Sequence, residues 1–396
     1  MKIIVQKGDT LWHYSQLFEV PLVLIIDSNR QLNAENLQIG STVKIPGYIQ
    51  ETYTIQSGDT FSSIAYQRNV SLQQLLFLNR EFHPTNLKIG TSIKIPIRVT
   101  WRLVLDLQSY DYEKMMSDLR KLITVYPFLQ RNSIGESVMN KPIPQVIIGS
   151  GMKKVHVNGS FHANEWLTTP LIMLFLNDYL LALTNQSNLR GINMFSLYTN
   201  TQMSLVPMVN PDGVNLVLNG APQEEPYRST VLELNEGSSN FSTWKANIRG
   251  VDLNNQFPAR WEIEKERKPR QPAPRDYPGD NPLTEPEAIA MATLTRNSNF
   301  SRVLAFHSQG EEIYWGFEGL EPPESEVIVN EFSRVSGYAP IRYVDSYAGY
   351  KDWFIQDFRR PGFTIEVGKG ANPLPMSQFG EIYNKNSGIL LASLYM

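Results

Sequence analysis

The chain has 396 residues, a length that suggests two or three domains. Hydrophobic residues make up 42% of it and charged residues 19%, a composition that excludes a mostly disordered protein. The 36 Lys and Arg residues are offset by 39 Asp and Glu residues, so no global basic field exists for nucleic acid or anionic lipid. Because cysteine is absent, cysteine nucleophiles are excluded and any metal site must use His, Asp or Glu.

No stretch of the sequence predicts a membrane span or a secretory signal. The most apolar stretch, residues 171–183, is interrupted by Asn177 and Asp178, whereas a span needs about 18 apolar residues. The first ten residues lack the long apolar region and the small-residue cleavage site of a secretory signal. We therefore expect no membrane span, and the sequence is compatible with a protein that is cytoplasmic when synthesised.

The N-terminal quarter contains two copies of one repeat, and residues 2–46 align with residues 52–96 without a gap. The segments that recur are Gly8-Asp9-Thr10 as Gly58-Asp59-Thr60, Asn29-Arg30 as Asn79-Arg80, and Lys44-Ile45-Pro46 as Lys94-Ile95-Pro96. Internal repeats of this kind indicate one structural unit used twice.

Each copy predicts a strand, two helices and a closing strand. The elements expected in the second copy are a strand at 53–55, a helix at 61–68 capped by Thr60, a helix at 72–79 capped by Ser71, and a strand at 93–95 that Pro96 ends. Residues 48–53 and 97–101 are expected to be short linkers.

Both copies resemble LysM domains, which bind the N-acetylglucosamine backbone of peptidoglycan or chitin. The resemblance implies LysM domains at 1–47 and 51–97, each with a glycan groove beside the loops that join strands to helices. The residues that would border these grooves are Gly8, Asp9, Thr10, Gly58, Asp59 and Thr60. The alternative is that these residues only form turns. The first copy departs from the family pattern at Trp12-His13-Tyr14, which either line the groove or pack the helix.

The remaining 300 or so residues alternate between strand and helix patterns. The expected elements are strands at 146–149, 155–159, 204–209, 303–306 and 363–367, a long apolar helix at 165–184, and a helix at 284–296 with a Thr284–Glu287 capping box. Such alternation predicts an α/β domain with helices on both faces of a mixed sheet. The Pro- and charge-rich stretch 258–282 is expected to be a long surface loop, either functional or a solvated insertion.

Three histidines lie outside the repeats, and two of them are candidates for a metal site. His162 and Glu165 are three residues apart at a strand-to-helix junction, so both side chains can reach one point. His307 follows a buried strand at its carboxyl end, where ligands bind in such sheets. Imidazole and carboxylate ligands suit zinc, and a catalytic zinc keeps three protein ligands and one open position. His156 lies inside a strand and is interpreted as a packed core residue.

These residues resemble the zinc carboxypeptidase (funnelin) family. Further segments with the family's pattern are 134–143, Asn210-Pro211-Asp212-Gly213, Gly250-Val251-Asp252-Leu253-Asn254, Tyr277-Pro278-Gly279, Glu285-Pro286-Glu287 and Phe363-Thr364-Ile365-Glu366. The resemblance implies a zinc peptidase domain at 100–396 with the family's mixed sheet. It also implies one Zn²⁺ per chain, held by His162, Glu165 and His307, and Glu366 as the group that moves the proton.

Two departures from the family pattern bear on substrate binding. An arginine that stabilises the oxyanion in the family is replaced by Lys245, and Arg249 is the alternative for this role. The family's carboxylate-binding Asn-Arg pair appears as Asn254-Asn255, so the bidentate clamp on a terminal carboxylate is lost. We therefore expect poor activity on ordinary carboxypeptidase substrates.

Two further positions follow from the resemblance alone. The family's mobile tyrosine corresponds to Tyr343, Tyr347 or Tyr350, of which Tyr347 is preferred. Lys351 occupies the place of the residue that selects the substrate side chain, where it would meet a carboxylate on diaminopimelate or else lie solvated at the surface.

LysM repeats before such a domain resemble the bacterial γ-D-glutamyl-meso-diaminopimelate peptidases, which cut the stem peptides of peptidoglycan. The expected partners are peptidoglycan and muropeptides, with no nucleic acid, and the expected location is the bacterial cell wall or the spore. The alternatives are a general zinc carboxypeptidase and a catalytically weak LysM binding protein. The presence of all three ligands and of Glu366 speaks against a protein that only binds.

Overall fold

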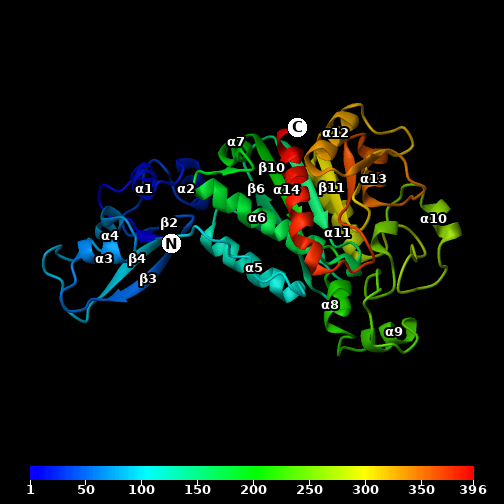
Figure 1. The fold of residues 1–396 in the computed structure, drawn as a ribbon, viewed down its shortest axis with the longest axis horizontal. Coiled ribbons are helices and arrows are strands. Elements are labelled where there is room, and N and C mark those ends of the chain that lie inside the picture. The colour runs from blue at the N-terminus through cyan, green and yellow to red at the C-terminus, as the bar shows by residue number, and fades with distance from the viewer. The chain divides into compact units, whose positions relative to one another are not determined.

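A computed structural model describes residues 1–396 (Figure 1). Contacts within the chain divide it into two compact units. The first unit comprises Met1–Leu103, Asp118–Leu129 and Asn177–Phe195, and the second comprises Val104–Ser117, Gln130–Leu176 and Ser196–Met396.

Both repeats in the first unit have the expected order of strand, helix, helix and strand. The first contains β1 (Lys2–Ile4), α1 (Leu11–Phe18), α2 (Leu22–Ser28) and β2 (Thr42–Lys44), and the second contains β3 (Tyr48–Thr54), α3 (Phe61–Gln67), α4 (Leu72–Leu78) and β4 (Ser92–Arg98). In each repeat the two strands form an antiparallel pair. Thr10, Thr60 and Ser71 cap α1, α3 and α4 through their side-chain oxygens, as expected for Thr60 and Ser71. The first unit also holds the short hairpin of β8 (Asn188–Leu189) and β9 (Ile192–Asn193).

The first expected linker is wrong and the second is wrong in part, because residues 48–53 lie in β3 and residues 97–98 lie in β4. β3 begins at Tyr48 and β4 continues through Pro96 to Arg98, so that Gln50 pairs with Pro96 in the ladder. The sheet has only two strands, and a proline is tolerated at such an edge because its free side needs no donor. Burial of Tyr48, which is 2% exposed, favours the longer pairing.

The second unit is built on an eight-stranded mixed sheet with the order β13-β12-β14-β11-β7-β10-β6-β5. Its strands are β5 (Gln130–Glu136), β6 (Pro142–Ile148), β7 (Lys153–Gly159), β10 (Thr201–Val206), β11 (Arg302–His307), β12 (Glu312–Tyr314), β13 (Ala339–Ile341) and β14 (Gly362–Glu366). The central strands β10, β7, β11 and β14 run parallel. Strand β6 is antiparallel to both of its neighbours, β10 and β5, and β12 is antiparallel to β14 but parallel to β13.

Helices cover both faces of this sheet. The helices of the chain beyond the repeats are α5 (Tyr112–Val125), α6 (Thr168–Thr184), α7 (Met194–Asn200), α8 (Pro211–Asn219), α9 (Tyr227–Leu234), α10 (Trp261–Arg267), α11 (Pro286–Ser298), α12 (Glu324–Ser336), α13 (Tyr350–Phe358) and α14 (Phe379–Tyr395). In β11, Val303 and Ala305 share a core cluster with α11 and α13. Residues of the opposite face are also fully buried, and there Phe363 meets Phe332 of α12 at 5.0 Å between ring centroids. The expected mixed sheet with helices on both faces is confirmed.

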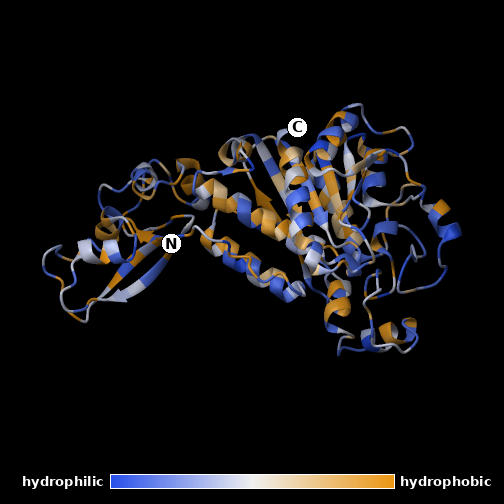
Figure 2. Cartoon of the chain, viewed as in Figure 1, coloured by the Kyte–Doolittle hydropathy of each residue, from blue (hydrophilic) through white to orange (hydrophobic).

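Helix α6 is long and largely apolar, and orange residues recur along it in Figure 2. By length and composition the helical stretch Ala163–Thr184 resembles a membrane span, with a mean hydropathy of 1.4, but 94% of its apolar window is buried inside the protein. A helix that is hydrophobic all round and buried in this way is typical of a protein core.

Two other expectations about local structure are corrected. Helix α11 begins at Pro286, and its N-cap is Glu285. The expected capping box does not form. The hydroxyl of Thr284 donates to Gln256, and Glu287 turns inward to accept from the backbone N–H of Val138. The segment 258–282 is not all loop, since it contains helix α10.

Candidate active site

Two histidines and a glutamate meet at the carboxyl ends of β7 and β11. The Nδ1 atoms of His162 and His307 lie 2.9 Å from Oε1 and Oε2 of Glu165, respectively, and 3.1 Å from each other. All three side chains are buried. The sequence-based expectation that His162, Glu165 and His307 lie together is therefore met by the geometry.

The chain reaches this point through a tight turn after β7. A side chain at Gly159 would place its Cβ 2.9 Å from atoms of Ile172 and Thr168, so only glycine allows α6 to approach the strand end. The next turn residue, Ser160, donates its backbone N–H to Thr168. The amide of Asn210, in the Asn-Pro-Asp-Gly segment, donates to the carbonyl of Phe161 and fixes the residue before His162.

The charges of the three side chains are strongly coupled. Burial lowers the pKa of His162, but the carboxylates of Glu165 and Asp252 outweigh it and raise that pKa to about 9. Burial likewise raises the pKa of Glu165, yet the two histidines hold it at about 2. Glu165 is thus an anion that faces the Nδ1 atoms of both histidines.

Glu366 ends strand β14 directly beside His307, because the two residues are partners in the parallel register of β11 and β14. Its neighbour on the other side is Glu312 of β12. Burial, and next the negative charge of Glu165, raise the pKa of Glu366 to about 8. A carboxyl group at this position, beside His307, is placed to take up and release a proton.

Lys245 lies in a network of carboxylates behind His162. Its Nζ is 3.0 Å from both Asp252 and Asp276, and Oδ1 of Asp252 is 3.2 Å from Nε2 of His162. Burial lowers the pKa of Lys245, but Asp252 and then Asp276 reverse this and raise it above its usual value. A lysine ammonium has three donors, so one remains after these two contacts.

The other residues expected to bind substrate are placed differently. Arg249 is half exposed and lies 3.6 Å from Glu285. The side chain of Asn254 accepts from the backbone N–H of Tyr350. Asn255 is buried, and its Nδ2 has no hydrogen-bond partner. An unpaired buried donor is costly unless a ligand accepts from it.

A cavity of about 470 Å³ lies beside helix α13. Its lining residues are Gly316, Phe317, Glu318, Gly319, Tyr343, Val344, Ser346, Tyr347, Lys351 and Asp352. Lys351 is buried, with Nζ 2.5 Å from Asp352 and donating to the carbonyl of Gly316 at 2.8 Å. It is therefore not a solvated surface lysine.

The three candidate tyrosines are distinguished by their surroundings. Tyr347 lines the cavity and meets Phe317 edge to face. Tyr343 also lines it, but is 54% exposed and donates to Glu321. Tyr350 is fully buried and its hydroxyl bonds that of Thr295, so it belongs to the core.

Comparison with known proteins identifies the family. The sequence pattern described as zinc carboxypeptidase matches residues 115–387, and the LysM domain pattern matches residues 3–46 and 53–96. The chain belongs to the zinc carboxypeptidase family. Both resemblances drawn from the sequence are thereby confirmed.

Two related proteins match all or most of the chain. Gamma-D-glutamyl-L-diamino acid endopeptidase 1 of Lysinibacillus sphaericus is 65% identical over 396 residues, which is 100% of both chains. The protein YqgT of Bacillus subtilis is 50% identical over 290 residues, which is 72% of this chain and 77% of that one.

Solved structures show the same fold. Thrombin-activatable fibrinolysis inhibitor superposes with a TM-score of 0.59 at 15% identity, over 78% of this chain and 88% of that one. Carboxypeptidase A from Helicoverpa armigera gives 0.54 at 15% identity, over 91% and 82% of the respective chains. At such low identity these likenesses concern the carboxypeptidase fold alone.

The family's zinc fits the residues of this site. Two imidazole nitrogens and a carboxylate lie within 4.8 Å of one another, which is the ligand set of a catalytic zinc with one open position. The outer nitrogen of His162 faces Asp252, and a carboxylate in that place orients a ligating histidine and raises its basicity.

Three contributors to this zinc carboxypeptidase site were not singled out from the sequence. Asp252 and Asp276 hold Lys245, and Asn372 donates to the carbonyl of Ser308 and approaches Glu165 at 3.4 Å. Asp252 lies in a segment that resembles the family, so its place in the site could have been predicted from the sequence. Asp276 and Asn372 lie in loops without a local pattern, and only the tertiary fold brings them here.

In both LysM repeats the Gly-Asp-Thr segment forms a turn. Asp9 and Asp59 each accept from the backbone N–H three residues earlier and from a tyrosine hydroxyl, that of Tyr14 and of Tyr53 respectively. Gly8 has a positive φ of 89° and Gly58 one of 87°, which glycine adopts without strain. The structure therefore supports the turn-forming role of these residues, and glycan contact stays a prediction.

Proposed function

We propose that this chain is a zinc peptidase that hydrolyses the γ-D-glutamyl bond to meso-diaminopimelate in peptidoglycan stem peptides. The observation that carries the hydrolytic part is the position of Glu366 beside the His162, Glu165 and His307 triad. The choice of bond is supported by the relative from Lysinibacillus sphaericus, which spans the whole chain and is named for cleavage between γ-D-glutamate and an L-diamino acid.

The proposed reaction is addition of water to the amide carbon, followed by loss of the amine. Zinc held by His162, Glu165 and His307, one ion per chain, supplies a Lewis acid that polarises the carbonyl and lowers the pKa of water. Glu366 accepts a proton from the attacking water and returns it to the nitrogen as the C–N bond breaks. The products are a free γ-carboxylate on D-glutamate and a free amino group on the diamino acid.

The charge that develops on the carbonyl oxygen needs a donor, and Lys245 is the proposed one. Two of its neighbours, Asp252 and Asp276, fix the ammonium and leave one N–H for the oxyanion. Arg249 is the weaker candidate, because it lies beside Glu285 and is half exposed.

The proposed selectivity pocket is the cavity that Lys351, Asp352 and Tyr347 line. The side chain of diaminopimelate ends in both an ammonium and a carboxylate. Lys351 and Asp352 offer one charge of each sign at the buried end of the cavity. Tyr347 is proposed to close over the bound residue.

Loss of the arginine clamp separates this site from a general carboxypeptidase. Asn254 and Asn255 are the proposed contacts to the polar groups of the diamino acid backbone, and Asn255 has a free Nδ2 for this purpose. An amide gives no charge-assisted bidentate contact, so peptides with a plain hydrophobic C-terminal residue are expected to bind poorly.

The repeats are proposed to hold the enzyme on its substrate. Glycan contact near Gly8, Asp9, Thr10, Gly58, Asp59 and Thr60 would raise the local concentration of stem peptides at the catalytic domain. We propose boundaries of 1–47 and 51–97 for the LysM domains and 100–396 for the peptidase domain, and a location at the cell wall or the spore.

A pair of synthetic tetrapeptides tests the proposed bond. Both contain L-Ala, D-Glu, meso-diaminopimelate and D-Ala, and they differ only in whether D-Glu is linked through its γ- or its α-carboxyl group. The zinc-loaded enzyme should release the diaminopimelyl dipeptide from the γ-linked peptide at least a hundredfold faster. Equal rates on the two peptides, or release of D-Ala alone, would overturn the proposal.

A further inference from the structure

The two LysM repeats pack on each other through one helix of each. Phe77 of α4 lies edge to face against His13 and Tyr14 of α1, with ring centroids 5.3 and 5.8 Å apart. At the other end of the same helices, Gln74 donates to the carbonyl of Leu17 at 2.8 Å. Of the three residues at which the first repeat departs from its family, His13 and Tyr14 thus serve contact between the repeats.

An ion pair closes this interface at the Gly-Asp-Thr loop of the first repeat. Arg80 donates to Oδ1 and Oδ2 of Asp9 at 2.8 and 2.6 Å, and its guanidinium stacks over Phe77 at 4.2 Å. The side chain of Asp9 is only 4% exposed, so this bidentate pair is shielded from water. Shielded, bidentate Arg–carboxylate pairs are among the stronger polar contacts.

The equivalent aspartate of the second repeat, Asp59, accepts from Tyr53 and Gln56 of its own repeat instead. Arg30, which corresponds to Arg80, lies 3.3 Å from Asp27 of its own repeat. Asp27 itself stands where the second repeat has Phe77. The contact is therefore a property of this pair of repeats and not of the repeat itself.

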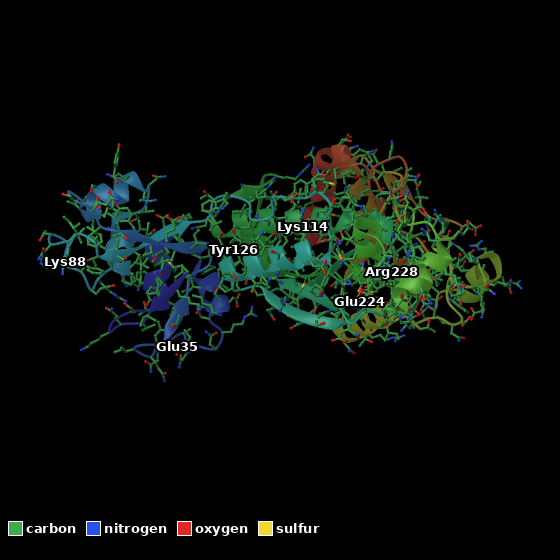
Figure 3. All side chains as sticks on the ribbon, turned by 90° about the horizontal axis from the view of Figure 1, so that it is seen from below. Glu35, Lys88, Lys114, Tyr126, Glu224 and Arg228 are labelled. Carbon is green, nitrogen blue, oxygen red and sulfur yellow. The ribbon has the colours of Figure 1, made fainter.

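The direction of the contacts places the two loop-bearing ends side by side. The beginning of α1 meets the end of α4, and the end of α1 meets the beginning of α4, so these helices are antiparallel. The loop before α1, residues 5–10, and the loop after α4, residues 79–91, consequently lie at the same end of the pair. Figure 3 labels Glu35 and Lys88, which lie in the equivalent loops after the second helix of each repeat.

We propose that the two repeats form one continuous surface that binds a single β-1,4-linked N-acetylglucosamine chain, with the Asp9–Arg80 pair at its centre. This inference rests on the proposed glycan binding by the repeats and goes beyond it by fixing how many chains are bound. Each repeat contributes the loop before its first helix and the loop after its second helix. The loop at residues 5–10 of the first repeat adjoins the loop at residues 79–91 of the second. Because Asp9 is engaged by Arg80, its role is to align the two halves and not to contact sugar.

Calorimetric titration of the full-length protein with chitin oligosaccharides of four and of eight sugars tests this. The wild-type protein should bind one eight-sugar chain per molecule, at least tenfold more tightly than the four-sugar chain, because a prealigned second half adds contacts without a second association cost. Arg80→Ala should lose most of this gain while its affinity for the four-sugar chain stays within about twofold. Arg68→Ala, which removes an exposed arginine at the end of α3 away from these loops, is the control and should behave as wild type.

Other outcomes separate the two proposals. Two eight-sugar chains per wild-type molecule, or equal length dependence in Arg80→Ala and Arg68→Ala, would overturn the single surface while leaving glycan binding intact. Wild-type protein that binds neither oligosaccharide would overturn both. Thermal melting will show whether Arg80→Ala is folded. If it is not, Phe77→Ala removes the side chain on which Arg80 stacks. For the proposal to stand, this variant must lose the gain in affinity for the eight-sugar chain.

Discussion

His307 and Glu366 are register partners at the carboxyl ends of the parallel strands β11 and β14. One residue is a proposed zinc ligand and the other is the proposed proton carrier, so the sheet itself sets their separation. Strands are rigid elements, and groups mounted on them keep their geometry better than groups on loops. The register of β11 and β14 therefore holds the proposed proton carrier next to the proposed zinc ligand.

Replacing His307 by alanine should remove both the metal and the activity. The change leaves one imidazole and one carboxylate, fewer than the three protein ligands of a catalytic zinc. Zinc measured by mass spectrometry should fall from about one per wild-type chain to near zero. His83→Ala, which alters an exposed loop histidine of the second repeat, should keep its zinc. Full zinc content in His307→Ala would remove this residue from the ligand set.

Replacing Glu366 by glutamine should abolish proton transfer but not metal binding. Glutamine has the same shape but cannot accept a proton from water. The kcat on the γ-linked tetrapeptide should fall by about 10²–10⁴-fold with zinc content unchanged, as is typical when a general acid–base group is lost. A rate near that of wild type would show that another group carries the proton.

Replacing Lys351 by methionine should change selectivity between stem peptides. The variant keeps the length of the side chain but loses the ammonium that is proposed to meet the diaminopimelate carboxylate. A charged hydrogen bond contributes about 1.5–3 kcal/mol, so kcat/KM on diaminopimelate stems should fall roughly tenfold to a hundredfold. Stems with L-lysine lack that carboxylate and should be affected much less.

Two controls apply to the Lys351 experiment. Lys121→Met makes the same chemical change at an exposed lysine of α5, outside the cavity, and should leave the preference unaltered. Loss of Lys351 also leaves Asp352 buried and unpaired, so unfolding must be measured for the variant. Equal slowing on both kinds of stem would identify Lys351 as a packing residue.

Buried Glu287 should make the folded protein less stable as the pH rises. Burial raises its pKa to about 8, well above the value of about 4.5 expected for the unfolded chain. Between these values the folded state binds the extra proton, so the free energy of unfolding falls with pH, by at most about 1.4 kcal/mol per pH unit. Urea unfolding of Glu287→Gln between pH 5 and 8 should show a smaller decline than wild type. An unchanged decline would mean that Glu287 is not the group responsible.

The sequence predicted the architecture wherever a repeat or a family pattern was present. The LysM repeats and the mixed sheet follow from local patterns, whereas the clustering of His162, Glu165 and His307 follows from the resemblance to the family, because His307 lies 142 residues after Glu165. The helix start at Thr284 was wrong because Gln256, a residue 28 positions away, takes the hydroxyl that would have capped it. The strand ends at Tyr48 and Arg98 were missed because Pro96 was taken as a stop, although an edge strand tolerates it.

The parts of the site that the sequence did not predict are those that depend on long-range contacts. Lys245 was expected to stabilise the oxyanion, but its ion pairs with Asp252 and Asp276 were not predicted. The burial of Lys351 was left open by the sequence, since an isolated lysine at a helix start has no local signal of burial. Contact between His13 and Phe77 joins two repeats and has no signature within either one.

The proposed cleavage of the γ-D-glutamyl bond is tested most directly by digesting purified muropeptides with the zinc-loaded protein and identifying the fragments by mass spectrometry. Cleavage at the proposed bond should leave the sugar attached to L-Ala-D-Glu and release peptides that begin with meso-diaminopimelate, and Glu366→Gln should release none. Fragments that instead lose only a C-terminal residue, with the γ-D-glutamyl bond intact, would contradict this account.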